Sequence, residues 1–180
     1  MRAFVAVFPP PKVAKEALAA ARLSPDKRIR LTRPENVHLT LKFLGDVREE
    51  LLDDIRAVLE KVCAGHAPFE AALAGLGAFP SVRQARILWA GVGEGSGRLR
   101  SLATDLDTGL ASLGFERERH PYTPHMTLGR VRGKPAKLQL PPVFIDSKFR
   151  VESIELVESV LSPEGSVYET LSTFALAGRS

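Results

Sequence analysis

Residues 37–44 read VHLTLKFL, and this stretch decides the fold. Apolar and polar side chains alternate along it, which is typical of a strand with one buried face. The alternation predicts that His38 and Thr40 project to one face while Leu39 and Leu41 project to the other. The stretch therefore predicts a β-sheet whose polar face carries a histidine and a threonine.

The sequence on either side supplies further strands and helices. Short runs rich in β-branched and aromatic residues predict strands, and apolar residues three and four positions apart predict helices. The predicted strands cover residues 2–8, 28–31, 37–44, 69–79, 85–92, 126–131, 149–161 and 167–176. The predicted helices are one that begins at Lys12 and ends before Ser24, and two at residues 48–63 and 97–113. We expect an α+β fold with antiparallel pairing, a loop from residue 132 to 142 and a closing hairpin from the last two strands.

The composition fits one folded domain. Of 180 residues, 44% are hydrophobic and 26% are charged, which is near the average of globular proteins and far from that of disordered chains. The length predicts a single domain over residues 1–180. The net charge of +4 and the pI near 9.5 permit a phosphate-bearing partner without requiring one.

Cysteine content and hydropathy indicate the compartment. Cys63 is the single cysteine, so no intrachain disulfide can form. The apolar run at residues 3–8 is too short for a signal-peptide core, and no stretch approaches the roughly 18 apolar residues of a membrane span. We expect a cytoplasmic protein with no membrane association.

The motif of the first paragraph occurs a second time. His125-Met126-Thr127-Leu128 repeats His38-Leu39-Thr40-Leu41 almost half the chain length later. With four histidines and eight threonines, chance predicts about 0.18 His-x-Thr triplets, and two copies that also carry the final leucine have a probability on the order of 10⁻⁴. The repeat predicts two corresponding strands that place both imidazoles and both hydroxyls on one groove.

Two imidazoles on opposite sides of one centre suit in-line displacement at phosphorus. One neutral ring removes a proton from the nucleophile, and one protonated ring gives a proton to the leaving oxygen. The ordinary histidine pKa near 6.5 makes both forms accessible at neutral pH. Threonine hydroxyls can donate to the non-bridging phosphate oxygens, and the scheme needs no metal.

These residues resemble the two-histidine (2H) phosphoesterases, and among them the bacterial RNA 2',3'-cyclic phosphodiesterases, also called 2'-5' RNA ligases. The resemblance rests on FVAVFPPP at residues 4–11, RPENVHLTLKFLGDV at residues 33–47 and YTPHMTLGRV at residues 122–131. It implies a bilobal, pseudo-twofold α+β fold in which two antiparallel sheets line a central groove and helices pack outside. It also implies hydrolysis of 2',3'-cyclic phosphate ends of RNA to 2'-phosphates without metal, ATP or other cofactor, and reversible 2'-5' joining in some members.

The resemblance also assigns roles to individual residues. It implies that His38 is the proton donor and His125 the proton acceptor, while Thr40 and Thr127 bind phosphate. Arg130 matches an arginine that follows the second motif in many relatives and is a further phosphate-binding candidate. The partners it implies are RNA ends with a cyclic phosphate, such as the halves of a cleaved tRNA, and we expect a monomer.

Strict alternation makes two basic residues ambiguous. Arg130 falls on the face of Met126 rather than that of His125, so it needs a β-bulge or the end of the strand to reach the groove. Lys42 falls on the face of Thr40, where it contacts the groove or guards a strand edge against pairing.

Other candidate residues receive a structural interpretation. Phe8, Phe43 and Tyr122 are possible platforms for a base, although we predict each to be a core residue. His66 and His120 lie outside the repeat and are predicted to be solvated. Two alternative functions remain: a non-catalytic protein that binds RNA ends or cyclic nucleotides, and a metal hydrolase, which the absence of Asp and Glu from both motifs disfavours.

Overall fold

A computed structural model describes residues 1–179, which form an α+β fold with antiparallel strands, as predicted. The strands are β1 (Arg2–Val7), β2 (Ile29–Leu31), β3 (Leu39–Asp46), β4 (Phe69–Phe79), β5 (Ile87–Val92), β6 (His125–Val131), β7 (Lys148–Val151), β8 (Ser153–Ser162) and β9 (Gly165–Ala175). The helices are α1 (Pro11–Ala21), α2 (Leu52–Ala64) and α3 (Ser96–Ala111), with short 3-10 turns η1 (Pro34–Asn36) and η2 (Glu49–Leu51).

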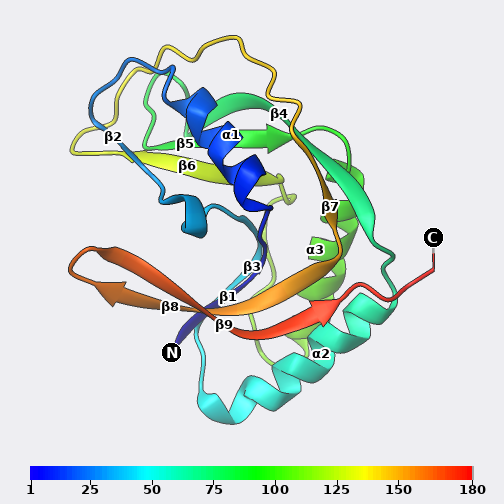
Figure 1. Cartoon of the computed structure of the whole chain (residues 1–180). Coiled ribbons are helices and arrows are strands. Elements are labelled where there is room, and N and C mark those ends of the chain that lie inside the picture. The colour runs from blue at the N-terminus through cyan, green and yellow to red at the C-terminus, as the bar shows by residue number, and fades with distance from the viewer. Residues whose placement is uncertain (180) are drawn as a thin grey trace.

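The strands join into one curled sheet with the order β7-β4-β5-β6-β3-β1-β8-β9, and β2 pairs with β6 as well. The two sheets that the resemblance implies are thus two halves of one sheet. The halves meet where Leu39 of β3 pairs with Met126 of β6. Figure 1 shows a half-barrel with β4, β5 and β6 in one arm and β1, β8 and β9 in the other.

Each helix buries one apolar stripe against the sheet. Pro11 begins α1, where its missing N–H costs nothing and its fixed φ suits a first turn. Helix α1 packs against β4, β5 and β6, α3 packs against β3, and α2 packs against α3 and β9 (Figure 1). The stripes share one hydrophobic core with Leu39 and Met126, so the helices cover the face opposite to the polar motif residues. In the described range, no helix has the length and apolar character to cross a bilayer.

Residues 149–161 do not form the single strand that their sequence predicts. The ladder breaks at Glu152, so β7 pairs with β4 in one half of the sheet while β8 pairs with β1 in the other. Alternation specifies that a segment is extended but not which strand it pairs with. The predicted closing hairpin is formed by β8 and β9.

Candidate functional site

The two repeated motifs meet at the seam between the halves of the sheet. Leu39 and Met126 face each other across the seam, and both side chains are fully buried. Because β3 and β6 are antiparallel, the residues beside this pair are neighbours in reversed order. Each motif histidine therefore lies next to the threonine of the other motif, with all four side chains half-buried on one face. These neighbours are His38 with Thr127 and His125 with Thr40.

Aromatic rings enclose His38, which directly precedes β3. The centroid of its ring is 4.9 Å from that of Phe4, which stacks on it. Phe8 and Tyr168 each lie 5.3 Å away between ring centroids, and the planes of the Tyr168 ring and the imidazole are nearly perpendicular. This apolar enclosure removes water from the ring and disfavours its charged form.

Two hydrogen bonds orient the His38 ring. Nδ1 lies 2.6 Å from the carbonyl oxygen of Asn36, and Nε2 lies 2.9 Å from Oγ1 of Thr40. Burial lowers the pKa of His38 below its ordinary value, the Asn36 carbonyl raises it, and the charge on His125 lowers it further.

His125 opens β6 and has a different set of neighbours. Its Nδ1 lies 2.7 Å from the carbonyl oxygen of Thr123. The ring meets Phe79 edge-to-face at 4.9 Å and lies 6.2 Å from Trp89, between ring centroids. The Trp89 indole covers Gly77, where a Cβ atom would come within 2.2 Å of the ring. The glycine at this position therefore leaves room for the Trp89 indole.

Both histidines are held in the same tautomer. In each, Nδ1 donates a hydrogen bond to the carbonyl oxygen two residues earlier in the chain. A neutral imidazole has one N–H, so this bond assigns the hydrogen to Nδ1 and leaves Nε2 as the acceptor. The arrangement makes each Nε2 the atom that takes or gives a proton.

A β-bulge follows each motif at the same position. Leu41 of β3 and Leu128 of β6, the last residue of each motif, have no partner opposite them. The flanking pairs are Ala6 with Thr40 and Val5 with Lys42 in one case, and Trp89 with Thr127 and Leu88 with Gly129 in the other. The extra residue reverses the alternation beyond it, so Phe43 and Arg130 point into the groove. The bulge that the sequence requires for Arg130 is thus present.

The same effect makes the prediction for Lys42 wrong. The bulge at Leu41 turns Lys42 to the helix side of the sheet, where its side chain is 2% exposed. Its Nζ lies 2.7 Å from Oδ1 of Asp107 on α3 and 2.7 Å from the carbonyl oxygen of Glu116, with Oε1 of Glu118 at 3.4 Å. Lys42 therefore joins β3 to α3 and to the segment that leads toward the second motif.

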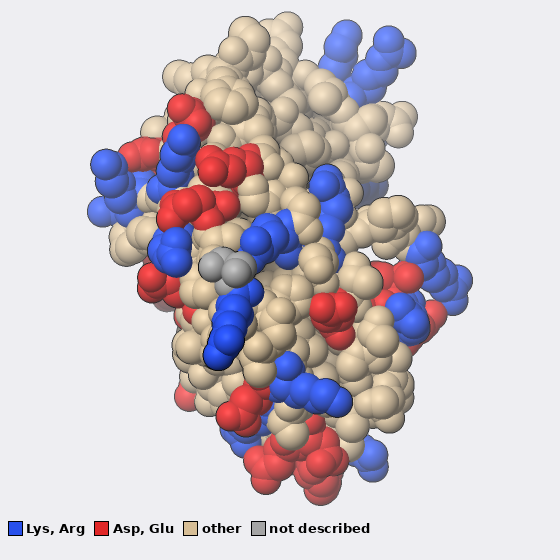
Figure 2. All heavy atoms as spheres, turned by 90° about the vertical axis from the view of Figure 1, so that its right-hand side faces the viewer, with Lys and Arg blue, Asp and Glu red and all other residues tan. Residues whose placement is uncertain are grey.

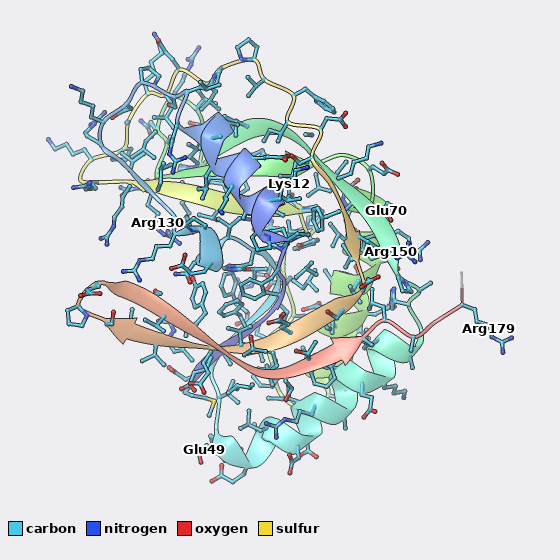
Figure 3. All side chains as sticks on the ribbon, viewed as in Figure 1. Lys12, Glu49, Glu70, Arg130, Arg150 and Arg179 are labelled. Carbon is cyan, nitrogen blue, oxygen red and sulfur yellow. The ribbon has the colours of Figure 1, made fainter. Side chains whose placement is uncertain are left out.

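A groove of about 540 Å³ opens on the motif face. Three of the four motif side chains line it, together with Arg130 and the β8–β9 hairpin. Figure 3 shows Arg130 at the opening between β6 and this hairpin. Nδ2 of Asn36 donates to the carbonyl oxygen of Ser166 at 3.0 Å, so the residue that orients His38 also holds one wall of the groove.

The three aromatic residues considered as base platforms lie in different environments. Phe43 is 68% exposed and lines the groove, so its assignment to the core is wrong. Phe8 is half-buried beside His38. Tyr122 lies in the core region as predicted, and burial raises its pKa.

The two histidines outside the repeat also differ. His66 is 10% exposed at its side chain, and its Nε2 lies 2.7 Å from Oδ2 of Asp105, so the prediction of a solvated ring is wrong. His120 is exposed as predicted. Among residues 1–179, no group of three or more His, Cys, Asp or Glu side chains is arranged to hold a metal ion.

Several residues that line the groove could not be identified as site residues from the sequence alone. Tyr168 reaches His38 only because β9 pairs with β8 and β8 pairs with β1. Arg30 and Arg33 lie in the segment before the first motif, where nothing local distinguishes them from solvated arginines. Their position becomes informative only when the register of β2 with β6 is known.

Known proteins have similar sequences and the same fold. The family model of the 2'-5' RNA ligase superfamily matches residues 9–162. The chain belongs to this superfamily. Within it, a Thermus thermophilus protein named RNA 2',3'-cyclic phosphodiesterase is 40% identical over 186 aligned residues, covering 99% of this chain and 91% of its own. A Methanothermobacter thermautotrophicus protein of the same name is 39% identical over 160 residues, covering 85% of each chain.

Solved structures of the superfamily share the fold. A crystal structure of a Thermus thermophilus protein superposes with a TM-score of 0.88 at 34% identity and covers all of both chains. The structure of E. coli LigT in complex with 3'-AMP superposes with a TM-score of 0.84 at 26% identity and covers 97% of each chain. The chain therefore shares its curled antiparallel sheet with both solved structures.

Proposed function

We propose that this protein hydrolyses the 2',3'-cyclic phosphate at RNA ends to a 2'-phosphate by metal-independent acid-base catalysis with two histidines. The observation that carries the proposal is the meeting of both motifs on one face of the seam, with each Nδ1 bound to a backbone carbonyl. Proton transfer then falls to Nε2, which in His38 also contacts the Thr40 hydroxyl. The relatives named RNA 2',3'-cyclic phosphodiesterase support it. Some members of the superfamily also join RNA ends, and we propose that reversible 2'-5' ligation occurs at the same site.

In this mechanism His125 acts as the base and His38 as the acid. Nε2 of His125 accepts a proton from water as the water oxygen attacks phosphorus. The bond from phosphorus to the 3'-oxygen breaks, and Nε2–H of His38 gives its proton to that oxygen. Hydroxyls of Thr40 and Thr127 donate to the non-bridging oxygens, and the Arg130 guanidinium balances their charge. The product carries the phosphate on the 2'-oxygen.

The surroundings of His38 affect this assignment. Burial lowers its pKa, so the acid form is less populated in the free enzyme. A bound phosphate diester brings a negative charge next to the ring and raises that pKa again. His38 thus becomes a better proton donor when the substrate is present.

We also propose that the two halves are lobes related by an approximate twofold axis. In each half a helix connects two strands of the sheet, α1 between β1 and β3 and α3 between β5 and β6, although β2 and η1 are inserted before β3. Each helix packs on the other half of the sheet, α1 on β6 and α3 on β3. The bulges at Leu41 and Leu128 occupy the same position in the two motif strands. These correspondences support a bilobal arrangement of the domain formed by residues 1–180.

The biological setting that we propose is a cytoplasmic monomer acting on RNA ends, the halves of cleaved tRNAs among them. Cys63 is a buried free thiol whose pKa is raised to about 11 by burial, which suits a reducing compartment. The nucleotide bound in the E. coli LigT structure supports a ribonucleotide in the corresponding groove.

The test is incubation of the pure protein with an RNA that ends in a 2',3'-cyclic phosphate, with EDTA present. We expect conversion to a 2'-phosphate, identified against 2'- and 3'-phosphate standards. His125→Ala should be slower by roughly 10²-fold or more. His120→Ala, which alters an exposed histidine outside the motifs, should match the wild type. Tight binding without turnover would support the non-catalytic alternative, and activity that requires an added divalent ion would support a metal hydrolase.

A further inference from the structure

The groove contains arginines that have no acidic partner. They are Arg2, Arg30, Arg33 and Arg130. Among residues 1–179 none of them forms an ion pair with a carboxylate. On the far side of the molecule, Arg150 lies 3.3 Å from Glu70, and Figure 2 shows acidic side chains beside basic ones over that face. The groove lining therefore carries four arginines without ion-pair partners and a single acidic residue, Glu164.

Two of these arginines face each other directly. Arg30 of β2 is the register partner of Arg130 of β6, so the two side chains leave the sheet on the same face with Cβ atoms about 5 Å apart. Like charges in this position destabilise a strand pair. An anion bound between or beside them removes the repulsion, so the arrangement points to a negatively charged ligand.

Arg33 extends the positive charge beyond this pair. Nη2 of Arg30 and Nη2 of Arg33 donate to the same carbonyl oxygen, that of Glu164, at 3.2 and 2.9 Å. Because a carbonyl oxygen carries no net charge, these hydrogen bonds do not neutralise the positive charge of either arginine. Each guanidinium also keeps further N–H groups that can donate to another acceptor. Both side chains are exposed on the groove.

We propose that Arg30 and Arg33 bind the phosphodiester that precedes the terminal nucleoside, while Arg130 and the threonines bind the cyclic phosphate. The proposal rests on the function proposed above and adds a second phosphate site to it. Two adjacent clusters of positive charge fit two successive phosphates of one strand. The groove then distinguishes an RNA end from a 2',3'-cyclic mononucleotide, which has no phosphodiester on its 5' side.

The experiment compares 2',3'-cyclic AMP with a diadenylate that ends in a 2',3'-cyclic phosphate. For the double variant Arg30→Ala/Arg33→Ala, we expect KM for the dinucleotide to rise roughly tenfold or more, because a charge-assisted contact is lost. Both kcat for the dinucleotide and KM for the mononucleotide should stay unchanged. The slope of log KM against log salt should decrease by about 0.7 for the lost phosphate contact.

Control variants separate charge from structure. Arg150→Ala removes an arginine outside the groove and should change neither substrate. Arg30→Gln/Arg33→Gln keeps an N–H donor on each side chain but removes the charge, and it should behave like the alanine variant. If the alanine variant impaired both substrates equally, the arginines would only support the β8–β9 hairpin and the proposal would be wrong. An unchanged KM for the dinucleotide would also overturn it.

A binding measurement keeps this test independent of catalysis. In a His125→Ala background, titration calorimetry gives Kd for the same two molecules without turnover. We expect the dinucleotide to bind more tightly than the mononucleotide, and the difference to disappear in the arginine variants. If the wild type hydrolysed neither molecule while this difference persisted, the proposed function would fail and the second phosphate site would stand. Equal affinities for the two molecules would exclude the site.

Discussion

The two motif sites are near twins in sequence but not in surroundings. His38 is enclosed by the rings of Phe4, Phe8 and Tyr168, whereas His125 stands at the start of β6 beside Phe79 and Trp89. Both rings have the same tautomer because the bond from Nδ1 to the carbonyl two residues earlier is local. The comparison teaches that a repeated motif sets the orientation of a catalytic group, while its proton affinity depends on neighbours from other strands.

The residues that follow the two bulges extend this comparison. Lys42 and Gly129 occupy equivalent positions on the helix side, and Phe43 and Arg130 occupy equivalent positions in the groove. One half of the site thus presents an aromatic ring where the other presents a positive charge. Such asymmetry suits a substrate with a base at one end and a phosphate chain at the other.

The strongest test of the comparison is removal of each histidine. His38→Ala and His125→Ala should each lower the rate of hydrolysis by roughly 10²-fold or more, which is the scale of general acid or base catalysis. A substrate whose leaving group has a low pKa needs no proton, so it should restore the rate of His38→Ala but not that of His125→Ala. Single-turnover rates with both substrates measure this difference. Rescue of His125→Ala instead would reverse the roles, and full activity in either variant would remove that histidine from the mechanism.

A second, smaller effect concerns stability at the position after the bulge. Lys42→Ala leaves the buried Asp107 carboxylate without its closest partner, which should destabilise the fold by about 3 kcal/mol and lower Tm by about 10 °C. Thermal unfolding followed by circular dichroism measures the change.

Arg117→Ala is the matched control for Lys42→Ala. Its guanidinium also bonds Asp107, at 3.2 Å, but is 59% exposed, so its removal should cost no more than about 1 kcal/mol. Equal losses of stability in the two variants would contradict the interpretation that burial makes the Lys42–Asp107 ion pair more important for stability than the exposed Arg117–Asp107 pair.

The third test uses the pH dependence of the reaction. Because a bound phosphate diester is anionic, it raises the pKa of the His38 imidazole next to it. The alkaline limb of the bell-shaped kcat profile, which reports the acid, should therefore lie at higher pH than that of kcat/KM, which reports the free enzyme, by about one unit or more. Steady-state rates at constant ionic strength measure both profiles. Coincident profiles would mean that the substrate phosphate does not interact with the titrating pair.

The smallest effect is on stability as a function of pH. Burial lowers the pKa of folded His38, so between that lowered value and the ordinary value near 6.5 the unfolded chain binds more protons than the folded one. The free energy of unfolding should fall as the pH falls through this window, with the full contribution present above 6.5. In His38→Gln the decline should be shallower. Urea unfolding at a series of pH values measures the two slopes, and identical slopes would show that burial of His38 has no energetic consequence.

Much of this fold follows from local sequence patterns. A strand was predicted at residues 69–79, where β4 forms, and the apolar stripe of residues 48–63 predicted α2 to within a few residues. In each motif the polar and the apolar side chains point to opposite faces of the sheet, because side chains alternate with a period of two residues along a strand. The failure at residues 149–161 shows the limit, because β7 and β8 share one pattern and differ only in the strand that each pairs with.

For the candidate site, the sequence by itself determined which residues we propose as carriers of the chemistry. The two His-x-Thr copies can be read directly from the sequence. The hydrogen bond from each Nδ1 to the carbonyl two residues earlier is also local, because it joins residues that are close in the chain. Only the tertiary structure decided that Arg130 enters the groove, that Lys42 leaves it and that Phe43 is exposed. The physical reason is that a bulge arises from the register between two strands distant in sequence, and one extra residue there reverses the face of every side chain up to the next irregularity. That register depends on the packing of the whole sheet, which no local pattern encodes.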